Sequence, residues 1–237
     1  TTLPAASLTA GPVASEGIAA LFGAGLAGSS QPASTLPLPT TLAGVQVFVR
    51  DSGGTERLAP LFYVSPSQIN FQVPLGASIG SATVTVFRDA VTVGQGTVTV
   101  EAVAPGLFAA NAAGLGVVAA QALRVTGEGV QTYEPIVQFD AEQAKYVALP
   151  IDLGPATDRV FLVAYGTGFR NRSSLSSVTA TIGGTGVDVG FAGPQGSYAG
   201  LDQVNTLLPR SLIGRGEVNL ILNVDGKAAN TVSINVK

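Results

Sequence analysis

The sequence predicts an all-β protein built from two tandem β-sandwich domains. Short segments rich in β-branched residues, partly alternating between apolar and polar side chains, recur at residues 45–49, 82–87, 97–100 and 218–222. Such segments are typical of half-buried strands. No stretch shows helical periodicity of useful length, so we expect no helical layer.

Gly-rich clusters separate these segments and supply the turns of the expected sandwiches. They lie at residues 51–54, 127–129, 183–186 and 225–227. Glycine readily adopts the positive φ that tight hairpin turns require. Short strands joined by such turns are typical of a sandwich rather than of alternating α and β units.

An internal repeat predicts the number of domains. A Gly-x-Gly-apolar motif occurs twice, and each copy is followed by a Gln-apolar-Asn motif with a proline four residues after the Asn. The repeated residues are Gly23, Gly25, Gln68, Asn70 and Pro74 in the first copy, and Gly166, Gly168, Gln203, Asn205 and Pro209 in the second. We expect structural roles for them: the glycines in tight turns, and the amides in hydrogen bonds to the backbone of an irregular strand.

The domain boundary is placed where a Pro-Gly pair, residues 105–106, interrupts strand pairing. Domain 1 is therefore expected at residues 1–103 and domain 2 at residues 104–237. Residues 104–153 precede the second repeat and carry a hairpin signal at residues 127–129. We expect this stretch to add strands to domain 2.

The composition excludes most kinds of catalytic and cofactor site. The chain has no His, Cys, Met or Trp, which rules out a Ser-His-Asp triad, a thiol nucleophile and an iron–sulfur cluster. Neither Gly-x-Gly motif is followed by the Lys-Ser/Thr of a phosphate-binding loop. The acid pairs Asp140 with Glu142 and Asp51 with Glu56 are best read as chance neighbours. We therefore expect no enzyme activity and no catalytic residue.

Calcium is the one cofactor that the sequence leaves open. Hard cations need only loop oxygens, and several acids fall in expected loops. These acids, which show no recognisable ligand spacing, are Asp51, Glu56, Asp152, Asp158 and Asp225. We expect no bound cofactor.

The low charge of the chain favours copies of itself as partners, rather than nucleic acid or a membrane. Charged residues make up 11% of the chain, where about 25% is usual. The net charge is −3 and the basic residues are scattered, which argues against nucleic acid. The longest apolar run, residues 18–28, is too short to span a membrane, and no basic segment of a signal peptide precedes it. Part of the charge-poor surface is expected to be covered by neighbours.

Three longer segments carry a resemblance to a known family. They are residues 59–74, which include the run Ser65-Pro66-Ser67-Gln68-Ile69-Asn70, and residues 104–108 and 200–205. Over nearly the whole chain the sequence resembles an uncharacterised two-module immunoglobulin-like family of the IPT/TIG type, common at the C-termini of secreted acidobacterial proteins. The resemblance implies immunoglobulin-like sandwiches, export and a place at the cell surface. It implies no catalytic residue.

Together these observations predict a structural subunit of an extracellular assembly, a filament or surface layer made of copies of this chain. An N-terminal segment that adds a strand to the next copy is a plausible contact. Its expected contact residues are Leu3, Pro4, Ala5, Ala6 and Leu8. The alternative is a monomeric surface adhesin or glycan-binding module, which predicts an exposed aromatic or acidic cluster. The five tyrosines at 63, 133, 146, 165 and 198 are expected mainly in core or rim packing.

Overall fold

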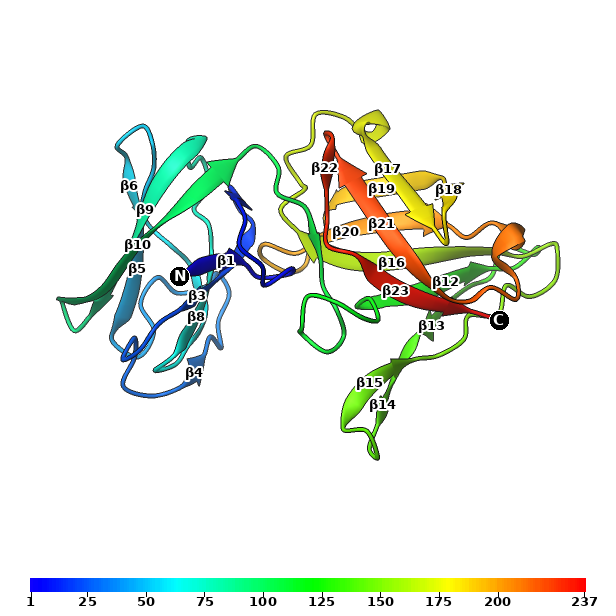
Figure 1. Ribbon diagram of the computed structural model, residues 1–237, viewed down its shortest axis with the longest axis horizontal. Helices are drawn as coiled ribbons and strands as arrows, with labels where there is room; N and C mark the ends of the chain where they lie inside the picture. Colours follow the sequence, from blue (N-terminus) through cyan, green and yellow to red (C-terminus); the bar gives the residue numbers. More distant parts are fainter.

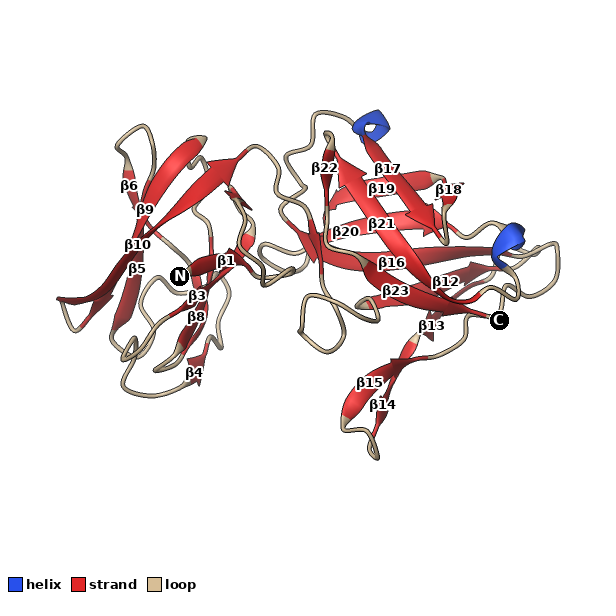
Figure 2. Cartoon of the chain, viewed as in Figure 1, coloured by secondary structure: helices blue, strands red, loops and turns tan.

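The computed structural model describes all 237 residues and is built from strands (Figures 1 and 2). The only helical segments are two single 3₁₀ turns, η1 (Leu175–Ser177) and η2 (Arg210–Leu212). The expectation of an all-β fold is therefore confirmed. No helix is long and apolar enough to cross a membrane.

Domain 1 is a sandwich of two five-stranded sheets. Sheet 1 has the order β1 (Thr2–Pro4), β3 (Ile18–Phe22), β8 (Gln68–Gln72), β7 (Leu61–Val64) and β4 (Gln31–Pro32). Sheet 2 has the order β2 (Val13–Ala14), β10 (Val91–Glu101), β9 (Gly80–Arg88), β5 (Val45–Arg50) and β6 (Glu56–Leu58). The expected strands at residues 45–49, 82–87 and 97–100 are β5 and parts of β9 and β10.

The side-chain alternation along these strands builds the core between the sheets. In β5 the side chains of Val45, Val47 and Val49 are buried, whereas Phe48 between them lies on the outer face. Successive strand side chains point to opposite faces, so this pattern lines one face of sheet 2 with valine. Ile69 and Phe71 of β8 face them from sheet 1 in the same buried cluster.

Domain 2 is a larger sandwich with its own core. Sheet 3 has the order β13 (Gln131–Pro135), β12 (Ala120–Val125), β16 (Arg159–Thr167), β20 (Asp202–Leu207) and β19 (Val189–Pro194), with β11 (Gly106–Leu107) also paired to β16. Sheet 4 has the order β18 (Thr185–Val187), β17 (Val178–Ile182), β21 (Gly216–Val224) and β22 (Lys227–Ala228), with β23 (Val232–Val236) also on β21. Two sheets around one core in each domain are the immunoglobulin-like sandwich architecture expected from the sequence.

The segment at residues 104–153 adds strands to domain 2 and forms an arm. It supplies β11, β12 and β13 to sheet 3. It then forms a separate hairpin of β14 (Val137–Asp140) and β15 (Lys145–Ala148), which projects from the body of the domain (Figure 1). The Asn111 side chain anchors this arm, since its amide nitrogen donates to the Tyr146 carbonyl oxygen at 2.9 Å and its oxygen accepts from the Tyr146 N–H at 2.7 Å.

The two cores divide between Val100 and Val103. Val100 packs in the first core, whereas Val103, which we expected to end domain 1, packs in the second. The side chain of Val103 is apolar and the chain turns toward domain 2 directly after β10, so the burial of this residue moves the division a few residues earlier than residues 103–104.

A buried ion pair of domain 2 lies at the contact between the domains. Asp202 at the start of β20 is fully buried, and its carboxylate accepts hydrogen bonds from Phe169 N at 2.8 Å, Arg170 N at 3.1 Å and Arg170 Nε at 2.8 Å. The Arg170 guanidinium also reaches Glu16 of domain 1 at 3.6 Å. Burial raises the pKa of Asp202, and the Arg170 charge and the two backbone N–H groups oppose that rise. We call Asp202, Arg170 and Glu16 the clamp.

Hydrogen bonds and close contacts around the clamp leave little freedom between the domains. The Thr167 hydroxyl accepts from Ile18 N of domain 1 and donates to the Gly200 carbonyl, both at 2.8 Å. Glycine is required at position 200 for the domains to approach this closely, because a Cβ there would lie 2.5 Å from the Ile18 side chain. A further ion pair between the domains joins Lys227 of β22 to Glu101 at the end of β10.

Removing the Arg170 charge tests the clamp. Arg170→Met leaves the buried Asp202 carboxylate without its cation, and breaking a buried pair in this way costs about 3 to 5 kcal/mol. We expect that loss in the free energy of unfolding measured with urea. The control is Arg159→Met, which removes an exposed arginine of the same domain. A loss below about 1 kcal/mol for Arg170→Met would show that the clamp does not stabilise the fold.

A second buried acid makes domain 1 sensitive to low pH. The Asp51 side chain accepts from Ser78 N at 3.0 Å, Arg57 Nη1 at 2.6 Å and Thr55 N at 3.0 Å. The Ser78 N–H first, and then the Arg57 side chain, hold the pKa of Asp51 far below its usual 3.8. A depressed pKa contributes stability that is present above the unfolded value and is lost as pH falls below it.

Asp51→Asn therefore has an expected signature in acid. The variant is less stable than the parent near neutral pH, and its free energy of unfolding falls less steeply below pH about 4. Urea unfolding at a series of pH values measures both effects. The same slope in parent and variant would mean that Asp51 titrates normally.

Candidate functional site

The repeated Gln and Asn side chains bond to each other rather than to the backbone. Gln68 Nε2 donates to Asn70 Oδ1 at 2.8 Å, and Gln203 Nε2 donates to Asn205 Oδ1 at 2.8 Å. Residues two apart on a strand lie on the same face, and both pairs lie on the half-buried outer face of their sheet. The expected hydrogen bonds to backbone are therefore absent from these two pairs.

The strands next to these pairs are irregular, as the sequence suggested. The register of β7 shifts just before Tyr63, which lies opposite Asn70. The register of β19 likewise shifts just before Phe191, which lies opposite Asn205. The two copies of the motif thus occupy equivalent places beside a bulge, and each is part of the sandwich framework.

The repeated glycines occupy turns and close contacts. Gly25 and Gly168 have positive φ values of 67° and 83°, which L side chains rarely adopt. A Cβ on Gly166 would lie 2.3 Å from the Gly106 carbonyl oxygen, and a Cβ on Gly23 would lie 3.0 Å from the Leu26 side chain. These glycines are explained by packing within the chain.

The repeated prolines each begin a turn. The Pro74 carbonyl oxygen accepts from Ala77 N at 3.3 Å, and the Pro209 carbonyl oxygen accepts from Leu212 N at 3.0 Å. Both bonds close a turn of four residues directly after the strand that carries the Gln and Asn side chains. The prolines thus end equivalent strands in the two domains.

The N-terminal segment is bound within its own chain. β1 is paired antiparallel to β3, with Leu3 opposite Ala20 and Pro4 opposite Ala19. Ala5 N donates to Ile18 O at 3.1 Å, and Leu8 N donates to Pro4 O at 3.0 Å. Ala6 is only 2% exposed. In this structure the segment is therefore not a free strand donor, because domain 1 itself uses its backbone and side chains.

Four of the five loop acids considered for calcium, all but Glu56, accept hydrogen bonds from N–H, hydroxyl or cationic groups of the chain; those of Asp51 are given above. Asp158 and Asp152 accept from Arg124 and Lys237, respectively, and Asp225 accepts from Ser173. No three acidic side chains gather into a group that could hold a metal ion. The structure therefore points to no particular metal site.

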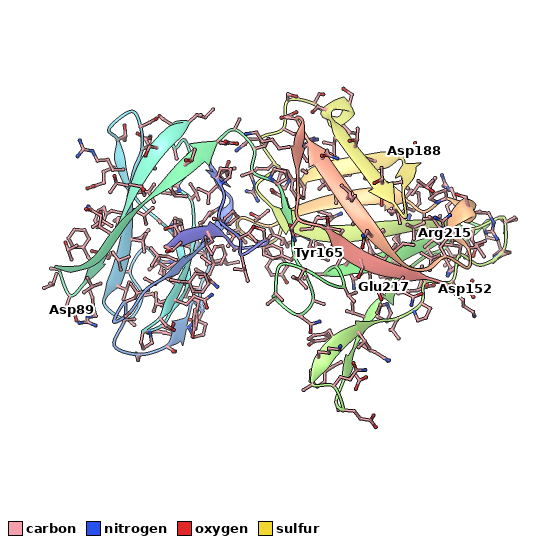
Figure 3. All side chains as sticks on the ribbon, viewed as in Figure 1. Asp89, Asp152, Tyr165, Asp188, Arg215 and Glu217 are labelled. Carbon is pink, nitrogen blue, oxygen red and sulfur yellow. The ribbon has the colours of Figure 1, made fainter.

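The longest open sheet edge belongs to β10. This strand pairs with β9 along its length, but on its other side it pairs with β2 only at Val100 and Glu101. Residues 91–99 are thus an edge, and they carry neither a charge nor a proline. Asp89 lies at the tip of the hairpin beside this edge (Figure 3). Natural edges are usually blunted by charge or proline, whereas this edge has neither. The N-terminal residues and Leu26 lie beside its middle, but no strand pairs with its backbone there.

Gly96 in the open edge has no explanation within the chain. A Cβ at this position would meet nothing within 4 Å, and its φ is not in the positive region. Glycine weakens a strand and often marks a place where another backbone approaches closely. Gly96 therefore leaves the backbone of this edge uncovered by a side chain, close to the register shift between Thr92 and Gly94.

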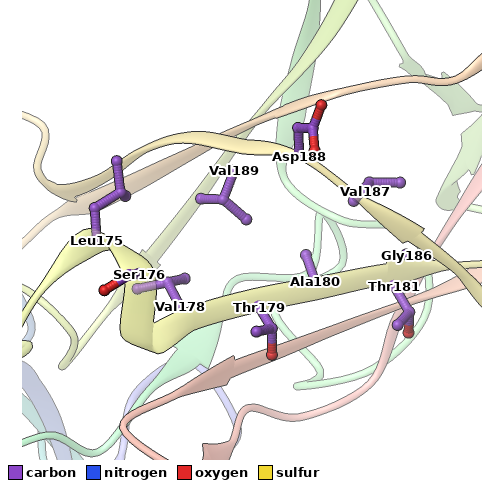
Figure 4. A pocket seen from close by; sticks show the side chains of 10 residues that line it. All are labelled: Leu175, Ser176, Val178, Thr179, Ala180, Thr181, Gly186, Val187, Asp188 and Val189. Carbon is purple, nitrogen blue, oxygen red and sulfur yellow. The ribbon is translucent and has the colours of Figure 1, made fainter.

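A second open edge lies in domain 2. This edge consists of Val178 and Thr179, because Ala180, Thr181 and Ile182 of β17 pair with β18. A groove of about 730 Å³ lies beside β17, η1 and the turn from β18 to β19 (Figure 4). It is lined mainly by apolar and hydroxyl side chains, including Leu175, Val178, Ala180, Val187 and Val189. Thr179 pairs with β21 on one side and with no strand on the other. A Cβ on Gly186 of β18 would again meet nothing within 4 Å.

Comparison with known proteins adds little to this geometry. No protein-family model matches the sequence, and no curated protein is a significant match. Among solved structures, the crystal structure of bovine butyrophilin is similar at a TM-score of 0.28 and 9% identity, over 97% of this chain and 96% of that chain. A likeness at this level carries no argument about function. The chain is an immunoglobulin-like β-sandwich protein on the evidence of its own sheets.

Proposed function

We propose that this protein is a structural subunit of an extracellular assembly in which copies join along open sheet edges. An immunoglobulin-like sandwich by itself suggests only a generic binding or structural module. The observation that carries the finer proposal is the uncharged, proline-free edge at residues 91–99 of β10. Such an edge is a template for strand addition.

The sequence of this edge suits antiparallel pairing with a second copy of itself. Gly94 and Gly96 lie on either side of Gln95, and every other residue from 91 to 99 is Val or Thr, both good strand formers. Pairing centred on Gln95 sets Val93 opposite Thr97 of the second copy. Two five-stranded sheets would then join into one continuous sheet.

The groove at β17 supplies a second contact in the other domain. A subunit with one contact in each domain grows into an open chain, because a single two-fold contact closes after two copies. The contacts between the domains support regular growth, since they restrain how the two domains lie relative to each other. The low share of charged residues, 11%, leaves little like-charge repulsion between copies.

The proposal includes a place outside the cell and no catalytic role. The extracellular place rests on the resemblance to IPT/TIG-type modules of secreted proteins, carried by residues 59–74, 104–108 and 200–205. The absence of His and Cys from the sequence supports a non-enzymatic role without a cofactor.

A charge placed at the centre of the edge tests the first contact. We expect Gln95→Lys to abolish assembly, because two-fold pairing sets the two lysines directly opposite each other. The matched control is Thr85→Lys, which adds the same charge opposite Gln95 on the inner strand β9. Light scattering after size-exclusion chromatography, with negative-stain electron microscopy, measures the size of the particles.

The parent and the control are expected to form dimers and longer particles as concentration rises, whereas Gln95→Lys stays monomeric. A parent that stays monomeric at every concentration contradicts the proposal. So does equal assembly of parent and Gln95→Lys.

A charge at the second edge separates growth from dimerisation. We expect Thr179→Lys to stop at dimers, because its β10 edge is intact while lysine blunts the edge of β17. The matched control is Asn223→Lys, opposite Thr179 on the inner strand β21, which is expected to form long particles. Filaments of Thr179→Lys as long as those of the parent would exclude the groove as a contact.

A further inference from the structure

Four of the five tyrosines gather on one side of domain 2, away from both open edges. Tyr133, Tyr146 and Tyr198 are 57%, 43% and 67% exposed, and Tyr165 lies half-buried among them. They come from β13, β15, the loop before β20, and β16. Tyr165 fits the expectation that tyrosines pack in the core or its rim, whereas Tyr133, Tyr146 and Tyr198 are exposed and do not.

The arm and the outer face of sheet 3 enclose a groove of about 510 Å³ between them. We call it the tyrosine groove. Its lining is Ala110, Ala119, Ala120, Gln121, Val137, Tyr146, Tyr165, Gln195, Tyr198 and Leu201. Tyr165, labelled in Figure 3, lines it from β16. The Asn111 amide holds the arm at Tyr146, so one wall of the groove has a fixed position.

The side-chain amide nitrogens of Gln121 and Gln195 are free to donate hydrogen bonds to a ligand. Gln121 Oε1 accepts from the Tyr165 hydroxyl at 3.2 Å, and Gln195 Oε1 accepts from Ser197 N at 2.9 Å. Each of these side-chain oxygens is thereby turned toward the protein, and neither amide nitrogen has a partner within the chain. Burial raises the pKa of Tyr165, and the nearby Tyr133 and Tyr198 raise it further, so its hydroxyl is neutral and can hydrogen bond.

The lining selects one class of ligand. No charged side chain lines the groove, so it offers nothing to an ion. The floor strands β12 and β16 are paired on both sides, so no free backbone edge is available to a peptide. A sugar ring has a flat C–H face that stacks on an aromatic ring, and a rim of hydroxyls that bond to amides and tyrosine hydroxyls.

We infer that the tyrosine groove binds a neutral glycan, with Tyr165 and Tyr198 against the sugar rings and Gln121 and Gln195 at their hydroxyls. The site is separate from the edges of β10 and β17 and does not depend on assembly. It gives a subunit of this kind the ability to hold a neutral polysaccharide.

The test is affinity electrophoresis of the full chain in gels that contain one polysaccharide each. The neutral probes are mixed-linkage β-glucan, xylan, galactomannan and a soluble α-glucan, and the anionic probes are polygalacturonate and alginate. We expect retardation by at least one neutral probe and none by the anionic ones. The monomeric Gln95→Lys variant is expected to be retarded equally, which separates this inference from the proposed function.

Tyr198 supplies the variant that assigns the site. Because its side chain is 67% exposed, Tyr198→Ala is expected to fold as the parent does and to bind about tenfold more weakly. Tyr198→Phe keeps the ring and is expected to retain most of the affinity. Leu75→Ala, which truncates a side chain of domain 1 that is 73% exposed, is the matched control and should bind as the parent does.

Three results would overturn the inference: no retardation by any neutral probe, retardation by anionic probes alone, or equal affinity of the parent and Tyr198→Ala. Thermal unfolding of each variant, followed by circular dichroism, checks that it is folded. If Tyr198→Ala unfolded early, Tyr198→Phe and Gln195→Ala would decide the assignment. Full affinity in Gln195→Ala would then also count against the groove.

Discussion

The buried ion pair between Asp202 and Arg170 fixes, within domain 2, the side chain through which this domain reaches Glu16 of domain 1. Burying a carboxylate is costly, and the cost is offset here only because two backbone N–H groups and a guanidinium meet it in good geometry. Arg170 then extends to Glu16, so the same side chain that satisfies a buried charge in domain 2 also contacts domain 1. The ion pair from Arg170 to Glu16 and the hydrogen bond from Ile18 N to the Thr167 hydroxyl cross between the domains, and both depend on side chains that domain 2 holds in place.

The two domains differ in the strands that extend their sheets and in the surfaces that remain uncovered. Domain 2 extends sheet 3 with β12 and β13 and then adds the arm, which turns one face of the sheet into a groove. Domain 1 has no such insertion, and its longest strand, β10, keeps an open side. The repeated Gln-apolar-Asn framework is therefore common to both domains, while their surfaces have diverged.

These differences place the two proposed roles on separate surfaces. The edges of β10 and β17 offer backbone groups, which suit another strand. The tyrosine groove offers rings and amides, which suit a ligand that has no strand to pair. In an assembly that repeats the groove along its length, many weak contacts to one polysaccharide would act together and raise the overall affinity.

Local chemistry alone determined the elements of this fold. The alternation of valines predicted the position of β5, and the Gly-rich clusters predicted the turns. Both predictions succeed because strand and turn preferences act over a few residues. The repeated motifs indicated two copies of one module. The outer-face position of Asn70 and Asn205 also follows from a period of two. The contacts between segments far apart in the chain could not be predicted from the sequence. Asp202 meets Arg170 from 32 residues away, and the groove collects tyrosines from three separate segments.

The same limit explains where the sequence misled. A short uncharged N-terminal segment resembles a free donor strand. Whether such a strand pairs within its own chain or with another copy depends on a sheet edge that exists only in the folded protein. β3 provides that edge within the chain, so β1 pairs there. Conversely, the sequence predicted a strand only at residues 97–100. The open side of residues 91–99 became visible only in the structure, where β2 pairs with β10 at Val100 and Glu101 alone. The sequence by itself determined which segments are strands and turns, whereas the tertiary structure alone decided which edges and faces remain uncovered, because coverage is a long-range property of the folded chain.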